Sequence, residues 1–367
     1  MYMANLGENI TYQDLYHAFQ QAYIFTYQKS ILPDIGKYWK KNNSEKVWSK
    51  SNLENFRSDK ILTKHLDDHE DFPISSYVSF VNEITEDQVL SLMDKINVGN
   101  ANLIKFKNVF LDYNKMFAAY WFDLLIKHSN PMNRSLNYLE IGGGFGQLAE
   151  IFLRKTNFKI ILIDLPEQNL LSAYYLKELH PNKKFLLFDT DKLKLGLTQE
   201  ILDNYDVVII PPGVSIDVGL RFDYFVNTRS MMEMKSKFIE KYFEIIQNHS
   251  KVGSYFLNVN RYEKNATGEP VQFAEYPYDA HWEVVVSHPS IIQNHIHLIL
   301  TKRLPTNEIG DIREELRRIG LLGEPYYVNQ TKIYSLAKYI DRYCLYFLRQ
   351  LRKFVKILFN VINHLSK

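Results

Sequence analysis

Short apolar runs alternate with helix-like stretches after Pro131, and this alternation limits the possible folds more than any other feature of the sequence. The segments between the first four runs match the spacing of repeated βα units, so right-handed crossovers should assemble these runs into a parallel sheet. The last two runs are divided by His288 and Pro289 and can return as an antiparallel pair. The candidate strands cover residues 136–141, 159–164, 184–189, 206–210, 253–258, 282–286 and 295–301. We therefore expect an α/β fold.

Helical patterns flank this α/β region on both sides. Apolar residues recur at three- and four-residue spacing upstream, and they predict a short amphipathic helix over 85–96 and a longer helix over 112–128. The sequence becomes helical again after Arg303. We expect a helical N-terminal region that serves as a substrate cap or in oligomerisation, an α/β domain, and a helical C-terminal extension. These three parts cover residues 1–110, 111–303 and 304–367.

Charge and cysteine content exclude several classes of protein. The formal net charge of +2 is far from that of a dedicated nucleic-acid binder, so we expect no nucleic-acid partner. The single cysteine, Cys344, excludes an intrachain disulfide and a cysteine-rich metal cluster, which fits a reducing compartment. The amino terminus lacks a signal-peptide pattern, and no apolar run is long enough to span a bilayer. These features together predict a cytoplasmic protein.

A glycine-rich loop follows the first candidate strand. Residues 137–146 read Asn-Tyr-Leu-Glu-Ile-Gly-Gly-Gly-Phe-Gly and lead into a helix predicted over 147–154. Glycines let the backbone approach a ligand without a Cβ in the way, and a helix start offers free N–H groups. The next candidate strand ends at Asp164, about 20 residues on, where a carboxylate can accept hydrogen bonds from ribose hydroxyls. The combination predicts a nucleoside-binding unit, whereas a plain tight turn without a ligand would not require Asp164.

Two enzyme classes share this unit, and the glycine spacing separates them. A dinucleotide oxidoreductase has the pattern G-x-G-x-x-G/A, but the sixth residue counted from Gly142 is Gln147, whose side chain stands where close helix packing needs none. What remains is acid-x-G-x-G-x-G, with Glu140 two residues before Gly142. This pattern resembles motif I of the class I S-adenosylmethionine-dependent methyltransferases.

The resemblance implies S-adenosyl-L-methionine as the cofactor and a Rossmann-like sheet with an antiparallel final strand. In that family the glycine loop wraps the methionine part of the cofactor, the acid that ends the second strand binds the ribose, and a residue after the third strand reaches the adenine. By position these are Glu140, Gly142, Gly144 and Gly146, then Asp164, then Asp189, for which Asp191 is an equal alternative. The tripeptide Asp-Leu-Pro at 164–166 is also similar to that of many small-molecule O-methyltransferases.

Two further segments bear on the acceptor of the methyl group. Residues 210–213 read Ile-Pro-Pro-Gly and lack the polar first and aromatic last residues with which amino-methylating DNA enzymes hold a flipped base. Residues 227–234 read Asn-Thr-Arg-Ser-Met-Met-Glu-Met, and with the Asn-Val-Asn at 258–260 they resemble the sugar O-methyltransferase family of bacterial surface-polysaccharide loci. The resemblance implies methylation of a sugar hydroxyl in surface-polysaccharide biosynthesis, with a small-molecule or lipid-linked sugar as substrate.

Two alternatives to that function stay open. The chain can be a methyltransferase for another small acceptor, such as a phenol or an amino-sugar nitrogen. It can also be a non-catalytic methyltransferase-like scaffold that holds partners in a glycan-assembly complex.

Methyl transfer to a hydroxyl requires a general base or a metal beside that hydroxyl. His281 is the first candidate base, because residues 276–282 form a loop rich in aromatic and hydrogen-bonding groups, and Glu233 is the second. A surface histidine and a first-turn helix acid are their ordinary structural roles. The candidate acceptor-binding residues are Asn227, Arg229, Tyr278 and Trp282, although a strand-to-helix cap explains Asn227 equally well.

Two remaining features concern metal and membrane. His295 and His297 share one face of a strand, but no acid accompanies them at a suitable spacing, so we expect no metal. Residues 333–365 keep an apolar stripe beside many Lys and Arg, a pattern typical of an interfacial membrane helix. A helix packed on the catalytic domain or on a second subunit also explains it, since ordinary surface helices bury one apolar stripe. Peripheral contact with the inner membrane face and a homo-oligomer are therefore both open.

Overall fold

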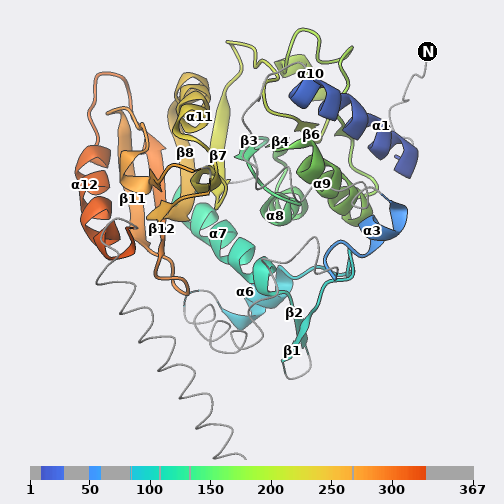
Figure 1. The fold of residues 1–367 in the computed structure, drawn as a ribbon, viewed down its shortest axis with the longest axis horizontal. Helices are drawn as coiled ribbons and strands as arrows, with labels where there is room; N and C mark the ends of the chain where they lie inside the picture. Colours follow the sequence, from blue (N-terminus) through green and yellow to red (C-terminus); the bar gives the residue numbers. More distant parts are fainter. Residues whose placement is uncertain are drawn as a thin grey trace, which may run out of the picture.

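The structure is a computed structural model that describes residues 10–28, 49–58, 83, 85–106, 109–131, 134–266 and 268–327 of the 367-residue chain. Its centre is an eight-stranded sheet with the order β11-β12-β8-β7-β3-β4-β6-β5 (Figure 1). The strands in that order are β11 (Trp282–Pro289), β12 (Ile296–Arg303), β8 (Ser250–Arg261), β7 (Phe222–Thr228), β3 (Asn137–Ile141), β4 (Lys159–Ile163), β6 (Val207–Ile210) and β5 (Phe185–Leu186).

The sheet is parallel except at one side. The strands from β8 to β5 run in the same direction, while β12 lies antiparallel between β8 and β11. This arrangement confirms the predicted α/β sheet with an antiparallel final strand.

Two details of the sheet differ from the sequence prediction. β7 was not among the candidate strands, because Asp223 and Asn227 interrupt its apolar residues. In addition, β6 rather than β5 pairs with β4, so β5 becomes the edge strand. The chain therefore passes to the edge of the sheet and returns inward before it reaches β7.

Helices cover both faces of the sheet, and short elements fill the connections. The α-helices are α1 (Tyr12–Tyr23), α3 (Lys50–Glu54), α6 (Glu86–Ser91), α7 (Tyr113–Ser129), α8 (Gln147–Lys155), α9 (Pro166–Leu179), α10 (Gln199–Asn204), α11 (Ser236–His249) and α12 (Ile312–Gly323). A π-helical turn, η1 (Ile24–Gln28), continues α1, and η3 (Met231–Glu233), η4 (Phe273–Glu275) and η5 (Glu324–Tyr326) are 3-10 turns. Two small antiparallel pairs join β1 (Ile104–Phe106) to β2 (Val109–Leu111) and β9 (Glu263–Lys264) to β10 (Val271–Gln272).

The long helix predicted before the sheet is confirmed as α7. The Asp112 carboxylate caps it by accepting hydrogen bonds from the N–H groups of Asn114 and Lys115, at 3.0 and 3.3 Å. The helix ends at Asn130, which adopts a left-handed conformation one residue before Pro131. The other predicted helix is shorter than expected, since α6 ends at Ser91.

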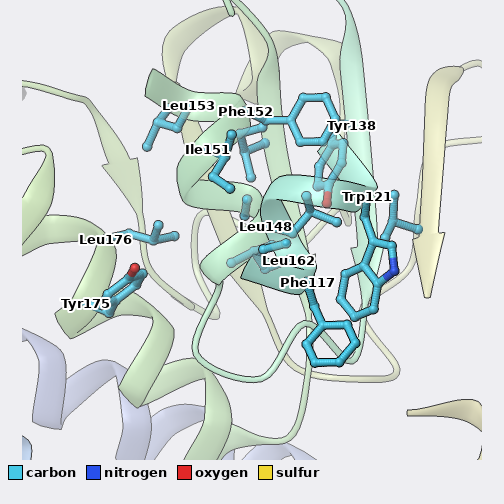
Figure 2. Close-up of a cluster of buried hydrophobic side chains, with 14 of the residues drawn as sticks. Phe117, Trp121, Tyr138, Leu148, Ile151, Phe152, Leu153, Leu162, Tyr175 and Leu176 are labelled. Carbon is cyan, nitrogen blue, oxygen red and sulfur yellow. The ribbon is translucent and has the colours of Figure 1, made fainter. Parts of the chain in front are cut away.

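Strand alternation divides the core into two layers. On β3, Tyr138 belongs to the cluster under α7 and α8, whereas Leu139 and Ile141 belong to the cluster on the opposite face. Figure 2 shows the first layer, where Phe152 of α8 packs against Tyr138 with ring centroids 4.7 Å apart. The sheet is thus held from both sides, and its carboxyl edge is fixed against the helices that follow each strand.

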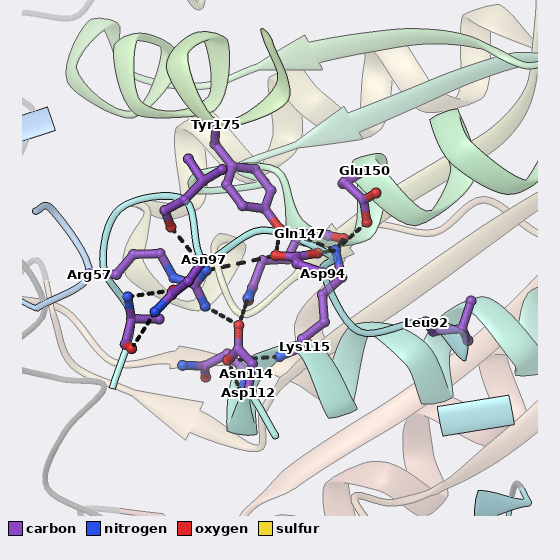
Figure 3. Close-up of polar contacts among 12 residues, drawn as sticks. Arg57, Leu92, Asp94, Asn97, Asp112, Asn114, Lys115, Gln147, Glu150 and Tyr175 are labelled. Carbon is purple, nitrogen blue, oxygen red and sulfur yellow. Dashed lines mark hydrogen bonds and ion pairs between the residues drawn. The ribbon is translucent and has the colours of Figure 1, made fainter. Parts of the chain in front are cut away.

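A buried charged network joins the N-terminal segments to this core (Figure 3). The Lys115 ammonium is fully buried and forms ion pairs with Asp94, at 2.8 Å, and with Glu150 of α8. Arg57 forms an ion pair with Asp112 of the α7 cap. The charged network consists of Arg57, Asp94, Asp112, Lys115, Gln147, Glu150 and Tyr175. Residues 49–58 and 85–100 are thereby anchored beside the glycine loop.

Part of the chain lies outside the described residues. This includes residues 333–365, so the amphipathic helix predicted there is not described. Among the described helices, none is long and apolar enough to cross a membrane. The division into parts at residues 110 and 303 stays a prediction.

Candidate active site at the carboxyl edge of the sheet

The glycine loop leaves β3 at the carboxyl edge of the sheet and leads directly into α8. Gly142, Gly144 and Gly146 all have positive φ, at 70°, 59° and 86°, a backbone conformation that residues other than glycine rarely adopt. A Cβ on Gly142 would overlap the Ser230 hydroxyl, so close packing requires this glycine. A Cβ on Gly144 would meet no atom within 4 Å. Gly144 is therefore the point where the loop opens onto free space.

Asp164 lies directly beside this opening. Its Oδ2 accepts a hydrogen bond from the Gly144 N–H at 2.9 Å, and its Oδ1 accepts one from the Leu165 N–H at 2.7 Å. β3 and β4 are parallel neighbours, so the residues that follow them meet at the same edge. The structure thus brings together the glycine loop and the acid that the sequence singled out.

Two acids at this edge have raised pKa values. Burial raises the pKa of Asp164 to about 7, against the hydrogen bonds from Leu165 and Gly144, which lower it. Burial likewise raises the pKa of Glu140 to about 7, against the Tyr138 hydroxyl, which donates a hydrogen bond of 2.9 Å. The charge of Asp164 further raises the pKa of Glu140. A cationic ligand at this opening would therefore stabilise the ionised form of both acids.

The N-terminal segment covers one side of this acidic region. The Tyr27 hydroxyl of η1 lies 2.8 and 3.0 Å from the two carboxylate oxygens of Glu167, at the start of α9. Phe25 packs against Phe188, with ring centroids 5.1 Å apart. Residues from the first helical segment therefore contribute to the surroundings of Asp164, whose pKa the Glu167 charge also raises.

Asp189 follows a strand that is not the direct neighbour of β4. Because β6 stands between β4 and β5, the residue that follows the neighbouring strand is Pro211, while Asp189 follows the edge strand. The Asp189 carboxylate accepts hydrogen bonds from the N–H groups of Asp191 and Lys192, at 2.9 and 3.1 Å, and so caps a turn. The role of Asp189 or Asp191 beside the adenine stays a prediction, since Phe188, which precedes Asp189, lines the same small cavity as Pro166.

Asn227 is fully buried, and its side chain is occupied by the protein. Its Nδ2 donates to the Ile141 carbonyl at 2.7 Å and to the Ser230 hydroxyl at 3.0 Å. Its Oδ1 accepts from the Met231 N–H at 3.2 Å and from Asn260 Nδ2 at 2.8 Å. Asn227 therefore positions the loop after β7, and its side chain is not free to bind the substrate that accepts the methyl group.

A second buried network follows from these contacts. Asn260 also donates to Asn258 Oδ1 at 2.6 Å and accepts from the Met232 N–H at 3.1 Å. We call Asn227, Ser230, Asn258 and Asn260 the amide network. It holds η3 and Ser230 against the glycine loop. The sequence motifs at 227–234 and 258–260 meet here, although the sequence did not predict a structural role for Ser230.

Glu233 lies at the end of η3, at the same edge as the glycine loop. Its carboxylate forms an ion pair with Lys264 of β9, and its charge raises the pKa of Asp164. The structure thus brings the second candidate base to the predicted cofactor region.

His281 lies at the opposite edge. β11 is antiparallel to β12, which is antiparallel to β8, so β11 runs in the same direction as the parallel strands. His281 precedes β11, whereas the glycine loop follows β3. The His281 Nδ1 lies 2.7 Å from the Glu308 carbonyl. Strand direction, which the loop composition could not reveal, removes His281 from the glycine-loop edge.

The aromatic residues near His281 are core residues. Trp282 is fully buried, with the Arg303 guanidinium 5.1 Å from its ring centroid. Tyr278 is also buried, and its hydroxyl accepts a hydrogen bond from Asn258 Nδ2 at 3.1 Å. The structure does not bring either residue to the opening at Gly144.

Arg229 follows β7 at the glycine-loop edge and adopts a left-handed conformation, with φ of 65°. Its N–H donates to the Val259 carbonyl at 2.6 Å, which fixes the backbone there. Its guanidinium carbon lies 4.1 Å from the Phe117 ring centroid and 5.4 Å from that of Trp121. The Nε and Nη2 atoms are buried and have no hydrogen-bond partner among the described residues. Burial lowers the pKa of Arg229 to about 10.

In the described ranges, no three His, Cys, Asp or Glu side chains are grouped so that they could hold a metal ion. His297 is fully buried, with its two ring nitrogens 3.0 Å from the Tyr262 hydroxyl and 2.7 Å from the Ser287 hydroxyl.

Comparison with known proteins finds distant matches among solved structures. No protein-family model and no curated protein matches the chain. A similar solved structure is that of TrmN from Thermus thermophilus, 8% identical with a TM-score of 0.33 over 51% of this chain and 49% of that one. A second is an S-adenosylmethionine-dependent methyltransferase from Clostridium acetobutylicum, 14% identical with a TM-score of 0.33 over 53% and 93%.

A third is an O-methyltransferase family 2 protein from Planctomyces limnophilus in complex with apigenin, 13% identical with a TM-score of 0.34 over 62% and 65%. The chain spans about half of the length of the TrmN structure. Similarity at this level says nothing about activity, which has to be inferred from the site itself.

Proposed function

We propose that this protein binds S-adenosylmethionine at the glycine-loop edge and transfers its methyl group to a hydroxyl of a sugar. The observation that carries the proposal is the contact between the Gly144 N–H and the Asp164 carboxylate, beside a position where the loop opens onto free space. When bound, the cofactor supplies an electrophilic methyl group on a sulfonium ion. Acids with raised pKa values suit such a cation, because its charge favours their ionised form.

Each residue of the opening has a distinct role in this proposal. The backbone of Gly144 approaches the methionine part of the cofactor, and Asp164 accepts hydrogen bonds from the ribose hydroxyls. Glu140 contributes negative charge beneath the loop. The segment that begins at Pro211 takes the place beside the adenine that the sequence had assigned to Asp189, because it follows the strand next to β4.

Glu233 is the general base in this proposal. It lies at the glycine-loop edge, and its ion pair with Lys264 holds the carboxylate in place. There it accepts the proton that the acceptor hydroxyl loses as oxygen attacks the methyl carbon. The amide network positions Glu233 through η3. Support for a sugar as acceptor, and for a role in surface-polysaccharide biosynthesis, comes from the resemblance of residues 227–234.

The helical region over residues 1–110 acts as a cap in this proposal. The contacts of Tyr27 with Glu167 and of Arg57 with Asp112 fasten its described segments beside the opening. The cytoplasmic location, the membrane contact of residues 333–365 and the oligomeric state stay predictions.

Calorimetric titration with S-adenosylhomocysteine tests cofactor binding, with a matched pair of glycine variants. Gly144 and Gly253 both have positive φ, and neither would place a Cβ within 4 Å of another atom. Gly144→Ala and Gly253→Ala should therefore carry a similar backbone strain of about 1 to 2 kcal/mol. Gly253 lies near the start of β8, at the other edge of the sheet. Only Gly144→Ala should weaken binding.

Incubation with labelled S-adenosylmethionine and a panel of nucleotide-linked and lipid-linked sugars then tests the acceptor. Transfer to a phenol or an amino-sugar nitrogen instead would correct the substrate class. No heat of binding for the unaltered chain would favour the non-catalytic scaffold and refute the enzyme.

A further inference from the structure

Arg229 is a half-buried cation whose Nε and Nη2 atoms are fully buried. Buried donors nearly always have partners, because an unpaired polar group in the interior is unfavourable. Yet Nε and Nη2 of Arg229 are buried and lack a hydrogen-bond partner among the described residues. These are adjacent donors of the planar fork, which match the two oxygens of a carboxylate or phosphate. The geometry is that of a donor pair without its acceptor.

The surroundings of Arg229 hold this fork in a fixed orientation. The guanidinium lies over the Phe117 ring of α7 and near Trp121, an arrangement that favours a cation on the aromatic face. The backbone is held in the left-handed region by the contact between the Arg229 N–H and the Val259 carbonyl. Strained backbone of this kind is concentrated at ligand sites. The side chain is therefore arranged before any ligand arrives.

A second arginine increases the positive potential at this place. Arg261 ends β8, is exposed, and is near enough for its charge to lower the pKa of Arg229 beyond the effect of burial. These like charges repel, and an anion bound by Arg229 would relieve that repulsion.

The position of Arg229 relates it to the reaction. It precedes Ser230, which packs under Gly142, and it lies four residues before Glu233 in the same loop. Glu140 and Asp164 lie at the carboxyl ends of β3 and β4, whereas Arg229 follows β7 and Arg261 ends β8. The edge therefore holds acids for a cationic cofactor and, on the other side of the glycine loop, two arginines in addition to the ion pair of Glu233 with Lys264.

We propose that the acceptor of the methyl group carries an anionic group, a phosphate or a carboxylate, that Arg229 binds through its Nε and Nη2, with Arg261 beside it. This inference rests on the proposed function and specifies its substrate class. A sugar linked to a nucleotide or lipid diphosphate, or a uronic acid, has the required anion next to its hydroxyls.

The test uses inorganic diphosphate and glucuronate as probes, titrated into the full chain saturated with S-adenosylhomocysteine. Binding of either probe to the unaltered chain supports the inference, and the probe that binds distinguishes phosphate from carboxylate. Arg229→Met keeps an apolar stem on the aromatic rings and should weaken binding at least 100-fold. Arg229→Lys keeps the charge without the fork and should weaken it about 10-fold. Arg221→Met is the control, because Arg221 is exposed at the other edge, and it should change nothing.

Three results would overturn the inference. The first is that neither probe binds the unaltered chain. The second is equal probe affinity in Arg229→Met and the unaltered chain. The third is a loss of S-adenosylhomocysteine affinity in Arg229→Met, since the cofactor's own carboxylate would then be the partner. Failure of the proposed function is distinguishable, because the unaltered chain would then bind no S-adenosylhomocysteine at the outset.

Discussion

Two buried polar networks support the glycine-loop edge, and they are built from different chemistry. The charged network lies on the side of α7 and α8, where the ammonium of Lys115 is fully buried between carboxylates of Asp94 and Glu150 (Figure 3). The amide network lies between β7 and β8, where Asn227 and Asn260 exchange neutral hydrogen bonds. The charged network joins segments far apart in the sequence, whereas the amide network fixes the conformation of the loop after β7.

The difference between the networks lies in what happens when one member is lost. Removal of one partner from a buried ion pair leaves a charge without compensation, whereas removal of an amide leaves only unsatisfied neutral groups. The charged network should therefore be critical for folding, and the amide network for the position of Glu233. Four predictions follow from this contrast, each aimed at one side of it.

The largest effect is expected for Lys115→Met. Loss of the ammonium leaves the carboxylates of Asp94 and Glu150 buried together, which should lower the free energy of unfolding by about 3 to 5 kcal/mol. Urea unfolding followed by circular dichroism measures this change. The control is Lys50→Met, which removes an exposed ion pair with Glu54 and should lower the free energy by less than about 1 kcal/mol. Equal effects of the two substitutions would show that the charged network does not stabilise the fold.

Glu233→Gln should have the next largest effect, on turnover alone. The amide cannot accept the hydroxyl proton, so the methyl-transfer rate should fall roughly 100-fold or more. Calorimetry should find the affinity for S-adenosylhomocysteine unchanged. His281→Ala should keep normal turnover, because His281 lies at the opposite edge. Normal turnover in Glu233→Gln together with a slow His281→Ala would reverse the assignment.

Asn227→Ala should have a moderate effect on stability and a specific effect on the site. The Met231 N–H loses its acceptor and the Ser230 hydroxyl loses the donor Asn227 Nδ2, which should lower the free energy of unfolding by about 1 to 3 kcal/mol. Turnover should fall as well, because η3 is no longer held against the glycine loop. Urea unfolding and initial-rate measurements on the same preparation separate the two effects. A stability loss as large as that of Lys115→Met would remove the contrast between the networks.

The smallest effect is a pH dependence of cofactor affinity. Asp164 and Glu140 have pKa values of about 7, so both are largely protonated below pH 6 and ionised above pH 8. The ammonium group of S-adenosylhomocysteine favours the ionised acids, so this ligand should bind more tightly as pH rises and release protons at pH 6.5. Each acid contributes at most about tenfold per pH unit. Asp164→Asn should flatten the curve.

The charged network should not contribute to this pH dependence. Although burial opposes it, the hydrogen bond from His180 and the charges of Lys115 and Arg154 hold the pKa of Glu150 well below its usual range. Glu150 therefore stays ionised throughout the titration. Calorimetry in two buffers with different ionisation enthalpies counts the protons released, and no release from the unaltered chain would contradict the prediction.

The sequence by itself determined the parts of the site that depend on neighbouring βα units. β3, the glycine loop, α8 and β4 follow one another, and a right-handed crossover between parallel strands necessarily brings Gly144 and Asp164 to the same edge. The apolar alternation likewise predicted the sheet and its antiparallel final strand. Gln147, the residue that breaks the oxidoreductase spacing, has a structural role, since its side chain donates a hydrogen bond of 2.7 Å to Asp112.

Only the tertiary structure decided the remaining assignments, because they depend on strand order, strand direction and burial. Insertion of β6 beside β4 made the strand before Asp189 the edge strand, and the direction of β11 placed His281 at the opposite edge. Burial turned Asn227 into a positioning residue and left the fork of Arg229 without a partner among the described residues. Each of these outcomes depends on contacts between segments far apart in the chain. The local periodicity of apolar residues does not determine which of those segments pair.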